Sequence, residues 1–122
     1  MTKPFVSIVG AGPGDPSLIT VRGLRHLSNA DVVIHDHLVP RRLIQLASPE
    51  AEIIDVGAAS LTKSVEQDAV SILLAEKVRE GHKVVRLKCG DPFVFDSGAK
   101  EASFLDKQGI PCELVPGIPT TI

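Results

Sequence analysis

The stretch FVSIVGAGPGD, residues 5–15, decides the fold of this chain. Its first five residues form an apolar run with β-branched side chains, which predicts a buried strand over residues 5–9. The glycine-rich segment that follows is typical of a tight loop after a strand. Pro13 has no backbone N–H, and Asp15 stands where a dinucleotide-binding fingerprint needs its third glycine. The stretch therefore predicts a strand that runs directly into a rigid loop.

Apolar runs and helical patterns alternate along the rest of the chain, which is the signature of a mainly parallel sheet covered by helices. Further strands are predicted over residues 31–35, 52–56, 83–88 and 112–115, and helices over residues 41–47, 65–80 and 99–108. Ser64 and Gln67 form a capping-box pattern at the start of the longest helix. The apolar spacing predicts two buried helix faces, one formed by Val21, Leu24 and Leu27 and the other by Val65, Ala69, Ile72 and Leu73. The sequence thus predicts one α/β domain, with a mainly parallel five-stranded sheet and helices on both faces.

The composition narrows the function classes. A chain of 122 residues that is 43% hydrophobic can build one domain core, and its formal net charge of −2 argues against a nucleic-acid binder. No apolar run is long enough to span a membrane, and the first residues do not form a signal-peptide pattern. Cys89 and Cys112 lack the spacing of zinc or redox sites and are interpreted as small buried hydrophobes. These features predict a cytoplasmic protein, and the end of the chain directly after a predicted strand favours truncation.

A second rigid loop, Cys89-Gly90-Asp91-Pro92, follows the strand predicted over residues 83–88. Because ligands bind beyond the carboxyl ends of the strands in an open α/β sheet, the two loops can form opposite walls of one pocket. Gly90 would let the backbone approach a ligand closely, and Asp91 could accept hydrogen bonds from it. The structural alternative, in which these aspartates only cap turns, stays open.

Asp36 follows the second predicted strand and lies between His35 and His37. It could act as a general base at the mouth of the sheet or be a surface turn residue, and the sequence leaves both roles open. The two histidines have no third ligand at a suitable spacing, so no metal site is predicted. Arg41 and Arg42 begin a helix, where cations gain nothing from the helix dipole. They are either solvated or available to bind the carboxylates of a ligand.

Three segments resemble the tetrapyrrole methylase family, and within it the members that methylate uroporphyrinogen III. They are VSIVGAGPGDPSLITVRGLRHLSNADVVIHDHLV, KVVRLKCGDPFVF and GIPCELVPGI, and they occur in this order from about residue 5 to the end of the chain. The combination of GAGPGDP and GDPFVF at this separation is specific. Members of the family have two α/β domains with S-adenosylmethionine in the cleft between them, and they usually form homodimers. The resemblance implies that this chain is the first domain, with S-adenosylmethionine as cofactor, S-adenosylhomocysteine as product and a tetrapyrrole as substrate.

The resemblance also assigns roles to individual residues. Asp36 matches the aspartate that is proposed as proton acceptor. Cofactor contacts are implied for Pro13, Cys89, Gly90, Asp91, Val94 and Thr120. Cations that could bind the carboxylates of the substrate are Arg22, Arg25, Arg41, Arg42, Lys63 and Lys100.

The departures from the family pattern lie mainly on the substrate side. Ala58 and Ala59 replace a Lys-Arg pair, so the lysine proposed as proton donor is absent. Ser97 replaces an arginine thought to act on the substrate. Further differences are His37 for an arginine, Lys100 for an acidic residue, Cys89 for a glycine and Pro119 for a threonine. The expected function is S-adenosylmethionine-dependent C-methylation of uroporphyrinogen III in siroheme or cobalamin biosynthesis. The alternatives are methylation of another tetrapyrrole and a non-catalytic S-adenosylmethionine-binding or dimerisation module.

Overall fold

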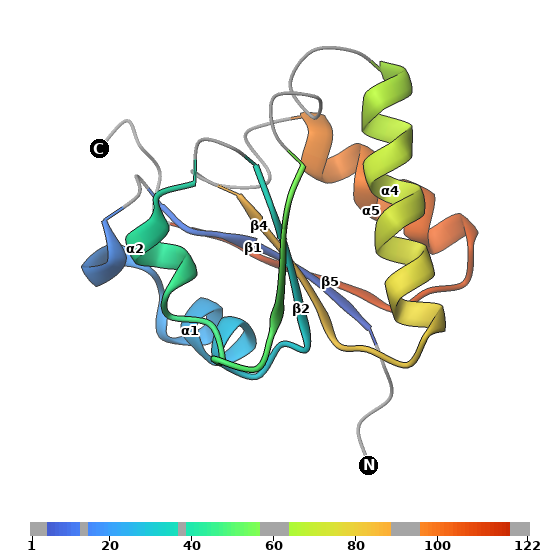
Figure 1. The fold of residues 1–122 in the computed structure, drawn as a ribbon. Helices are drawn as coiled ribbons and strands as arrows, with labels where there is room; N and C mark the ends of the chain where they lie inside the picture. The colour runs from blue at the N-terminus through green and yellow to red at the C-terminus, as the bar shows by residue number, and fades with distance from the viewer. Residues whose placement is uncertain (1–4, 13–14, 37–38, 57–63, 89–95, 118–122) are drawn as a thin grey trace.

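A computed structural model describes residues 5–12, 15–36, 39–56, 64–88 and 96–117, with the backbone alone for 64–68 and 96–100. Strands and helices alternate along these residues as the sequence predicts (Figure 1). The elements are β1 (Val6–Gly10), η1 (Pro16–Leu18), α1 (Val21–Ser28), β2 (Val32–His35), α2 (Arg41–Ile44), β3 (Glu52–Asp55), α4 (Ser64–Arg79), β4 (Val84–Lys88), α5 (Asp96–Lys107) and β5 (Cys112–Val115). Each strand lies within one residue of its predicted bounds. The helices differ more, because α2 ends three residues early and α5 begins three residues early.

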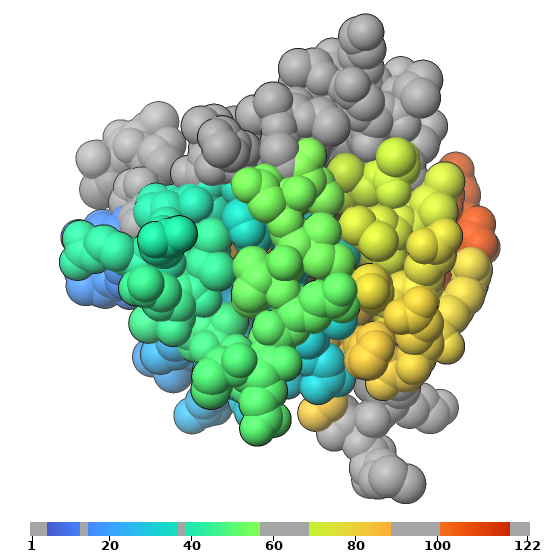
Figure 2. Space-filling view, in the orientation of Figure 1, coloured from blue at the N-terminus to red at the C-terminus, as the bar shows by residue number. Residues whose placement is uncertain are grey.

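The strands of the described part of the chain form one five-stranded sheet in the order β3-β2-β4-β1-β5. The four strand pairs that build it are parallel, and β2, β4 and β1 are its inner strands. Figure 2 shows β3 as the green segment exposed at one edge of the sheet between α2 and α4. Its exposed pattern agrees with this position, since an edge strand has one neighbour fewer.

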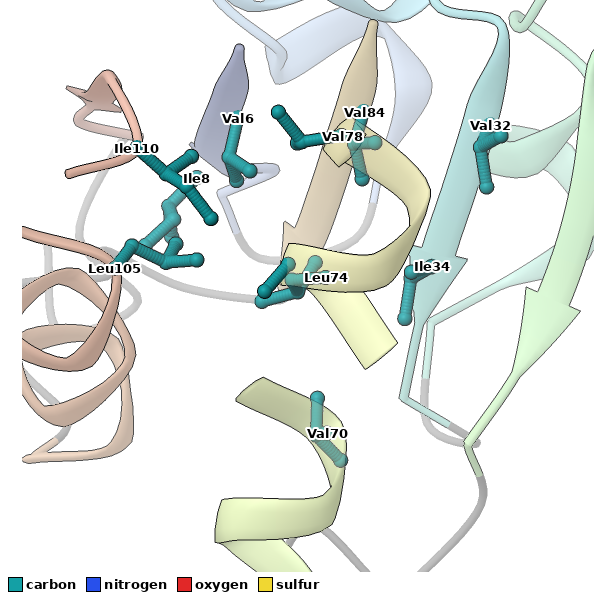
Figure 3. Close-up of a cluster of buried hydrophobic side chains, with 11 residues drawn as sticks. Val6, Ile8, Val32, Ile34, Val70, Leu74, Val78, Val84, Leu105 and Ile110 are labelled. Carbon is teal, nitrogen blue, oxygen red and sulfur yellow. The ribbon is translucent and has the colours of Figure 1, made fainter. Parts of the chain in front are cut away.

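Successive strand residues pack into two separate cores, one on each face of the sheet. On one face Val6, Ile8, Val32, Ile34 and Val84 pack with residues of α4 and α5 (Figure 3). On the other face, alternate strand residues pack with Leu27 of α1 and Leu43 of α2. Figure 1 shows the same arrangement, with α1 and α2 on one side of the sheet and α4 and α5 on the other. The prediction of helices on both faces is confirmed.

The buried face of α1 differs from the predicted one. Leu27 is fully buried as expected, but Val21 is 69% exposed and Leu24 is 38% exposed. The helix instead packs against the sheet through Gly23, where an added Cβ would lie 3.1 Å from a methyl group of Val9. This close approach turns the glycine side of the helix inward and leaves two of the three predicted core residues outside.

The predicted face of α4 is wrong at two of its four residues, while Leu73 packs half-buried against the core as predicted and the side chain of Val65 lies outside the described part of the chain. Val70, Leu74 and Val78 are buried, whereas Ile72 is 48% exposed and Ala69 is exposed. The apolar run at residues 72–74 covers much of the helix circumference, so spacing alone does not fix which side faces the sheet. Packing against the sheet and α5 selects the i, i+4, i+8 series that starts at Val70. Ser64 is the first residue of the helix, and its predicted capping partner Gln67 has no described side chain.

Candidate functional site

The chain leaves two neighbouring inner strands toward opposite faces of the sheet. After β1 it continues to α1 on one face, and after β4 it continues to α5 on the other. Because β1 and β4 are parallel neighbours, these two connections diverge from adjacent points at the carboxyl end of the sheet. Such a divergence is the topological switch point at which open α/β sheets bind their ligands. The fold therefore places the candidate site beyond the carboxyl ends of β1 and β4.

The loops after β1 and β5 touch through backbone at this end of the sheet. A Cβ added to Gly117 would lie 2.6 Å from the carbonyl oxygen of Gly10 and 2.8 Å from the backbone nitrogen of Gly12. Real Cβ atoms do not approach other atoms so closely, so residue 117 must be a glycine for the loops to pack in this way. Gly12 itself has a φ of 73°, in the left-handed region that glycine adopts most readily. Two chain segments are thus held together without any side chain between them.

The residues predicted to contact the cofactor, Pro13, Cys89, Gly90, Asp91, Val94 and Thr120, lie outside the described residues. The described residues next to them show where the three segments begin. The last described residue of the first segment is Gly12, two residues after β1. Lys88 is the last residue of β4, and Gly117 lies two residues after β5. These three strands are neighbours in the sheet. In addition, the amide of Ala11 donates a hydrogen bond of 2.7 Å to the carbonyl of Lys88, which extends the pairing of β1 with β4.

Asp36, the predicted proton acceptor, lies at the same end of the sheet, directly after β2. It is not a freely solvated turn residue, because its side chain is only 11% exposed. Its Oδ1 accepts a hydrogen bond of 2.7 Å from Nη2 of Arg86, a residue of β4. The neighbouring His35 is also buried, and its Nδ1 donates to the backbone carbonyl of Asp36 over 2.8 Å.

Sequence reasoning missed the residues that surround this carboxylate. Arg86 is fully buried and also donates from Nε to Oε2 of Glu101 on α5, at 3.2 Å. Lys88 is 4% exposed, and its Nζ lies 3.6 Å from the other carboxylate oxygen of Glu101. Burial lowers the pKa of Lys88, and the adjacent positive charge of Arg86 lowers it further. We call Asp36, Arg86, Lys88 and Glu101 the buried charge network.

A signal for this network is present in the sequence. Arg86 and Lys88 alternate with apolar residues in a strand predicted to be buried, so both side chains must lie on one face of an inner strand. A buried charge requires a partner of opposite sign, and this requirement predicts carboxylates near both residues. The identity of the partners does not follow, because Asp36 and Glu101 come from distant parts of the chain.

The structure also places the other residues that the sequence singled out. Asp15 caps the short helix η1 by accepting from the backbone N–H of Ser17, and this bond lowers its pKa. Arg41 and Arg42 begin α2 and are exposed. Burial raises the pKa of Cys112 to about 11, so its thiol stays protonated and unreactive near neutral pH.

The histidine pair that flanks Asp36 is only partly described, because His37 lies outside the described residues. Among the residues that are described, no group of three or more His, Cys, Asp or Glu side chains could hold a metal ion. No helix in the described ranges is both long and apolar enough to cross a bilayer.

The opposite end of the sheet contains two surface cavities of about 390 and 560 Å³. The smaller one is lined by Phe5, Arg22, Arg25, His26 and Lys83, among others. His26 contacts both Ser7 and Glu113, at 2.9 and 2.8 Å, and these three residue types also occur together in hydrolase catalytic triads. Ser7, however, lies within β1 and is only 1% exposed, so its hydroxyl is not accessible for attack on a substrate. These contacts tie α1 to β5 and form no part of the candidate site.

Comparison with known proteins identifies the family. Residues 6–121 match the family of tetrapyrrole (corrin/porphyrin) methylases. The chain is 48% identical over 117 residues to a uroporphyrinogen-III C-methyltransferase of Methanocaldococcus jannaschii, covering 96% of this chain and 48% of the relative. It is 52% identical over 113 residues to siroheme synthase 2 of Pectobacterium atrosepticum, covering 93% of this chain and 25% of the relative.

A solved structure gives the same result. The uroporphyrin-III C-methyltransferase of Thermus thermophilus, in complex with S-adenosylhomocysteine, superposes with a TM-score of 0.82 at 43% identity. The match covers 94% of this chain and 48% of that one. The chain thus spans between a quarter and a half of the length of these relatives. It belongs to the tetrapyrrole methylase family.

Proposed function

We propose that the protein containing this chain transfers methyl groups from S-adenosylmethionine to carbon atoms of uroporphyrinogen III, on the route to siroheme or cobalamin. The observation that carries this proposal is the divergence of the loops after β1 and β4, with Asp36 at the same end of the sheet. Relatives named as uroporphyrinogen-III C-methyltransferase and siroheme synthase support the choice of reaction and substrate.

The described part of the site fits S-adenosylmethionine. The backbone of Gly10 and Gly12 packs directly against Gly117, so polar backbone atoms rather than side chains border this part of the site. A ligand with several hydrogen-bonding groups can be held by such backbone at close range. We assign the direct contacts to Pro13, Cys89, Gly90, Asp91, Val94 and Thr120, which continue from the described ends of the loops. The similar enzyme of Thermus thermophilus, solved in complex with S-adenosylhomocysteine, supports the choice of cofactor.

The reaction requires mainly positioning. When bound, S-adenosylmethionine supplies an electrophilic methyl group on a sulfonium sulfur. The site must align an electron-rich pyrrole carbon with that methyl group and exclude water. As the new C–C bond forms and the C–S bond breaks, the substrate ring becomes positively charged and then loses a proton. We assign Asp36 to accept this proton on its carboxylate, and the adjacent guanidinium of Arg86 favours the ionised form that this role requires.

A tetrapyrrole with many carboxylates also needs cations at the mouth of the site. Arg41 and Arg42 are exposed at the start of α2, which follows the Asp36 loop, and are candidates for this role. We further propose that the chain is the first of two domains of a cytoplasmic homodimer, as the family resemblance implies. Light scattering on the protein that contains this chain tests the dimer.

Three differences from the family pattern favour one alternative, methylation of a different tetrapyrrole. Ala58, Ala59 and Ser97 stand where the family has lysine and arginine residues, so the protein could methylate a different tetrapyrrole. A third outcome is a module that binds the cofactor without catalysis.

One experiment separates these outcomes. The protein is incubated anaerobically with methyl-labelled S-adenosylmethionine and each of several reduced tetrapyrroles, and S-adenosylhomocysteine binding is measured by calorimetry in parallel. Label in uroporphyrinogen III supports the proposal, and label in another tetrapyrrole supports the alternative. Binding without label in any tetrapyrrole supports the non-catalytic module. If ATP or NAD displaces S-adenosylhomocysteine, the site is instead a general nucleotide site.

A further inference from the structure

The position of Arg86 is not explained by packing. It lies in the middle of β4, where it pairs in register with Ile8 of β1 and Ile34 of β2. Its side chain is fully buried on the face of the sheet that packs against α4 and α5. Taking a guanidinium out of water is costly, and replacing a buried ion pair by apolar residues is often neutral or stabilising. An apolar side chain would suit this position better if stability were its only role.

The contacts of Arg86 connect the candidate site with α5. Its guanidinium donates to Asp36 at 2.7 Å and to Glu101 at 3.2 Å, and a third contact of 3.4 Å reaches the carbonyl of Ile34. One planar group thus holds carboxylates from two different elements in fixed relative positions. Arg86 cannot rotate away from Asp36 without also losing Glu101.

Asp36 is the most exposed member of the buried charge network, although it too is largely buried. The side chains of Arg86 and Glu101 are fully buried and that of Lys88 is 4% exposed, whereas that of Asp36 is 11% exposed. The two cations and two carboxylates balance in charge. Within the described part of the chain, His35 bonds the backbone carbonyl of Asp36, and Asp55 of β3 pairs in register with His35. Asp36 thus has the most exposed side chain of the network, and the groups around it are buried and balance in charge.

We propose that Arg86 is a positioning residue for Asp36. Its guanidinium keeps the carboxylate ionised and in one orientation at the carboxyl end of the sheet, and Glu101 in turn fixes the guanidinium. This inference rests on the proposed function, in which Asp36 accepts the proton released by the methylated ring. The acceptor can be a weak base, because the proton comes from a ring that already carries a positive charge.

Two variants separate the charge of Arg86 from its geometry. Arg86→Lys keeps the positive charge but loses the planar group that reaches both carboxylates. The double variant Arg86→Gln, Glu101→Gln removes one charge of each sign and keeps hydrogen-bonding amides, so Lys88 and Asp36 remain a balanced pair. Arg79→Met is the control, because Arg79 also donates a hydrogen bond to a residue near α5, Gln108 directly after the helix, but is exposed.

Two readouts are measured on each folded variant of the protein that contains this chain. The first is the titration of the Asp36 carboxyl carbon by NMR, assigned with Asp36→Asn. The second is the pH dependence of kcat, together with the KM for S-adenosylmethionine. In the double variant we expect Asp36 to titrate at higher pH and the acid side of the kcat profile to shift upward with it. In Arg86→Lys we expect kcat to fall roughly tenfold to a hundredfold through misplacement of the carboxylate, with KM for S-adenosylmethionine unchanged.

The outcomes keep the two proposals distinct. An Asp36 titration and a kcat that stay as in the wild type in both Arg86 variants would overturn the positioning role. An equal loss of kcat in Arg79→Met would also overturn it, since the effect would then be a general one. If the wild-type protein transfers no methyl group, the proposed function fails, while the NMR titration still decides whether Arg86 controls the ionisation of Asp36. If the double variant does not fold, Arg86→Lys alone decides the matter.

Discussion

Replacing Gly117 with alanine should force apart the two loops that border the candidate site. The added Cβ would lie 2.6 Å from the carbonyl oxygen of Gly10 and 2.8 Å from the amide nitrogen of Gly12. These are backbone atoms, so no side chain can rotate to make room, and the loops must separate by roughly 0.8 Å or more to reach ordinary contact. Overpacking of this kind costs about 1–3 kcal/mol of folding free energy. We expect the unfolding midpoint in urea to fall accordingly.

The same substitution should weaken cofactor binding. If S-adenosylhomocysteine binds the closed arrangement of the loops and closing them again costs about 1 kcal/mol, its Kd rises roughly fivefold. Calorimetric titration of the protein that contains this chain measures this change.

Gly81→Ala is the matched control for Gly117→Ala. Gly81 follows α4 with a φ of 96°, and an added Cβ there meets no atom within 4 Å. Alanine in this conformation is strained by about 1–2 kcal/mol, so the control loses similar stability without touching the site. We expect its affinity for S-adenosylhomocysteine to equal that of the wild type. Wild-type stability and affinity in Gly117→Ala would show that the loops do not pack as closely as described. An equal loss of affinity in Gly81→Ala would show that the effect is not specific to these loops.

Three further predictions concern the proton acceptor, the core and the half-buried thiol of Cys112. Asp36→Asn should lower kcat by roughly 10²–10⁴-fold and leave S-adenosylhomocysteine binding unchanged, and near-normal turnover would exclude Asp36 as the proton acceptor. Leu74→Ala should cost about 2–5 kcal/mol in urea unfolding, and Ile72→Ala only about 0.5 kcal/mol; equal losses would contradict the observed face of α4. Burial raises the pKa of Cys112 from 9.0 to about 11, so the folded state favours the neutral thiol. The contribution of this thiol to the free energy of unfolding is therefore complete below pH 9 and is lost as the pH rises toward 11. Cys112→Ala should flatten this decline, and an unchanged profile would show that other groups cause it.

The strands followed from the sequence more accurately than the helix faces. Each strand is a short segment with at least one β-branched residue and is closed by a glycine, a proline or a polar residue, so both its type and its ends are encoded locally. The faces of α1 and α4 depend on the partner surface. Gly23 directs α1 toward β1, and the apolar run around Ile72 gives α4 several equivalent faces. Neither feature is decided by spacing within the helix.

The location of the site could be predicted from the sequence, but the residues that hold Asp36 in place could not. The glycine-rich loops after two strands predicted a pocket at the carboxyl end of the sheet, because parallel α/β topology brings such loops together. The contact of Arg86 with Asp36 joins residues 50 positions apart, and its contact with Glu101 depends on how α5 packs. Local patterns carry no information about such distances. The presence of Arg86 and Lys88 in a buried strand indicated that partners exist, without naming them.

The conclusion most in need of a test is that the protein containing this chain transfers methyl groups to uroporphyrinogen III. The most direct measurement is anaerobic incubation of the protein that contains this chain with uroporphyrinogen III and S-adenosylmethionine, followed by mass spectrometry of the tetrapyrrole. We expect a product heavier by one or two methyl groups, formed although Ala58, Ala59 and Ser97 replace the usual lysine and arginine residues. An unchanged tetrapyrrole mass, with S-adenosylhomocysteine binding confirmed in the same sample, would contradict it.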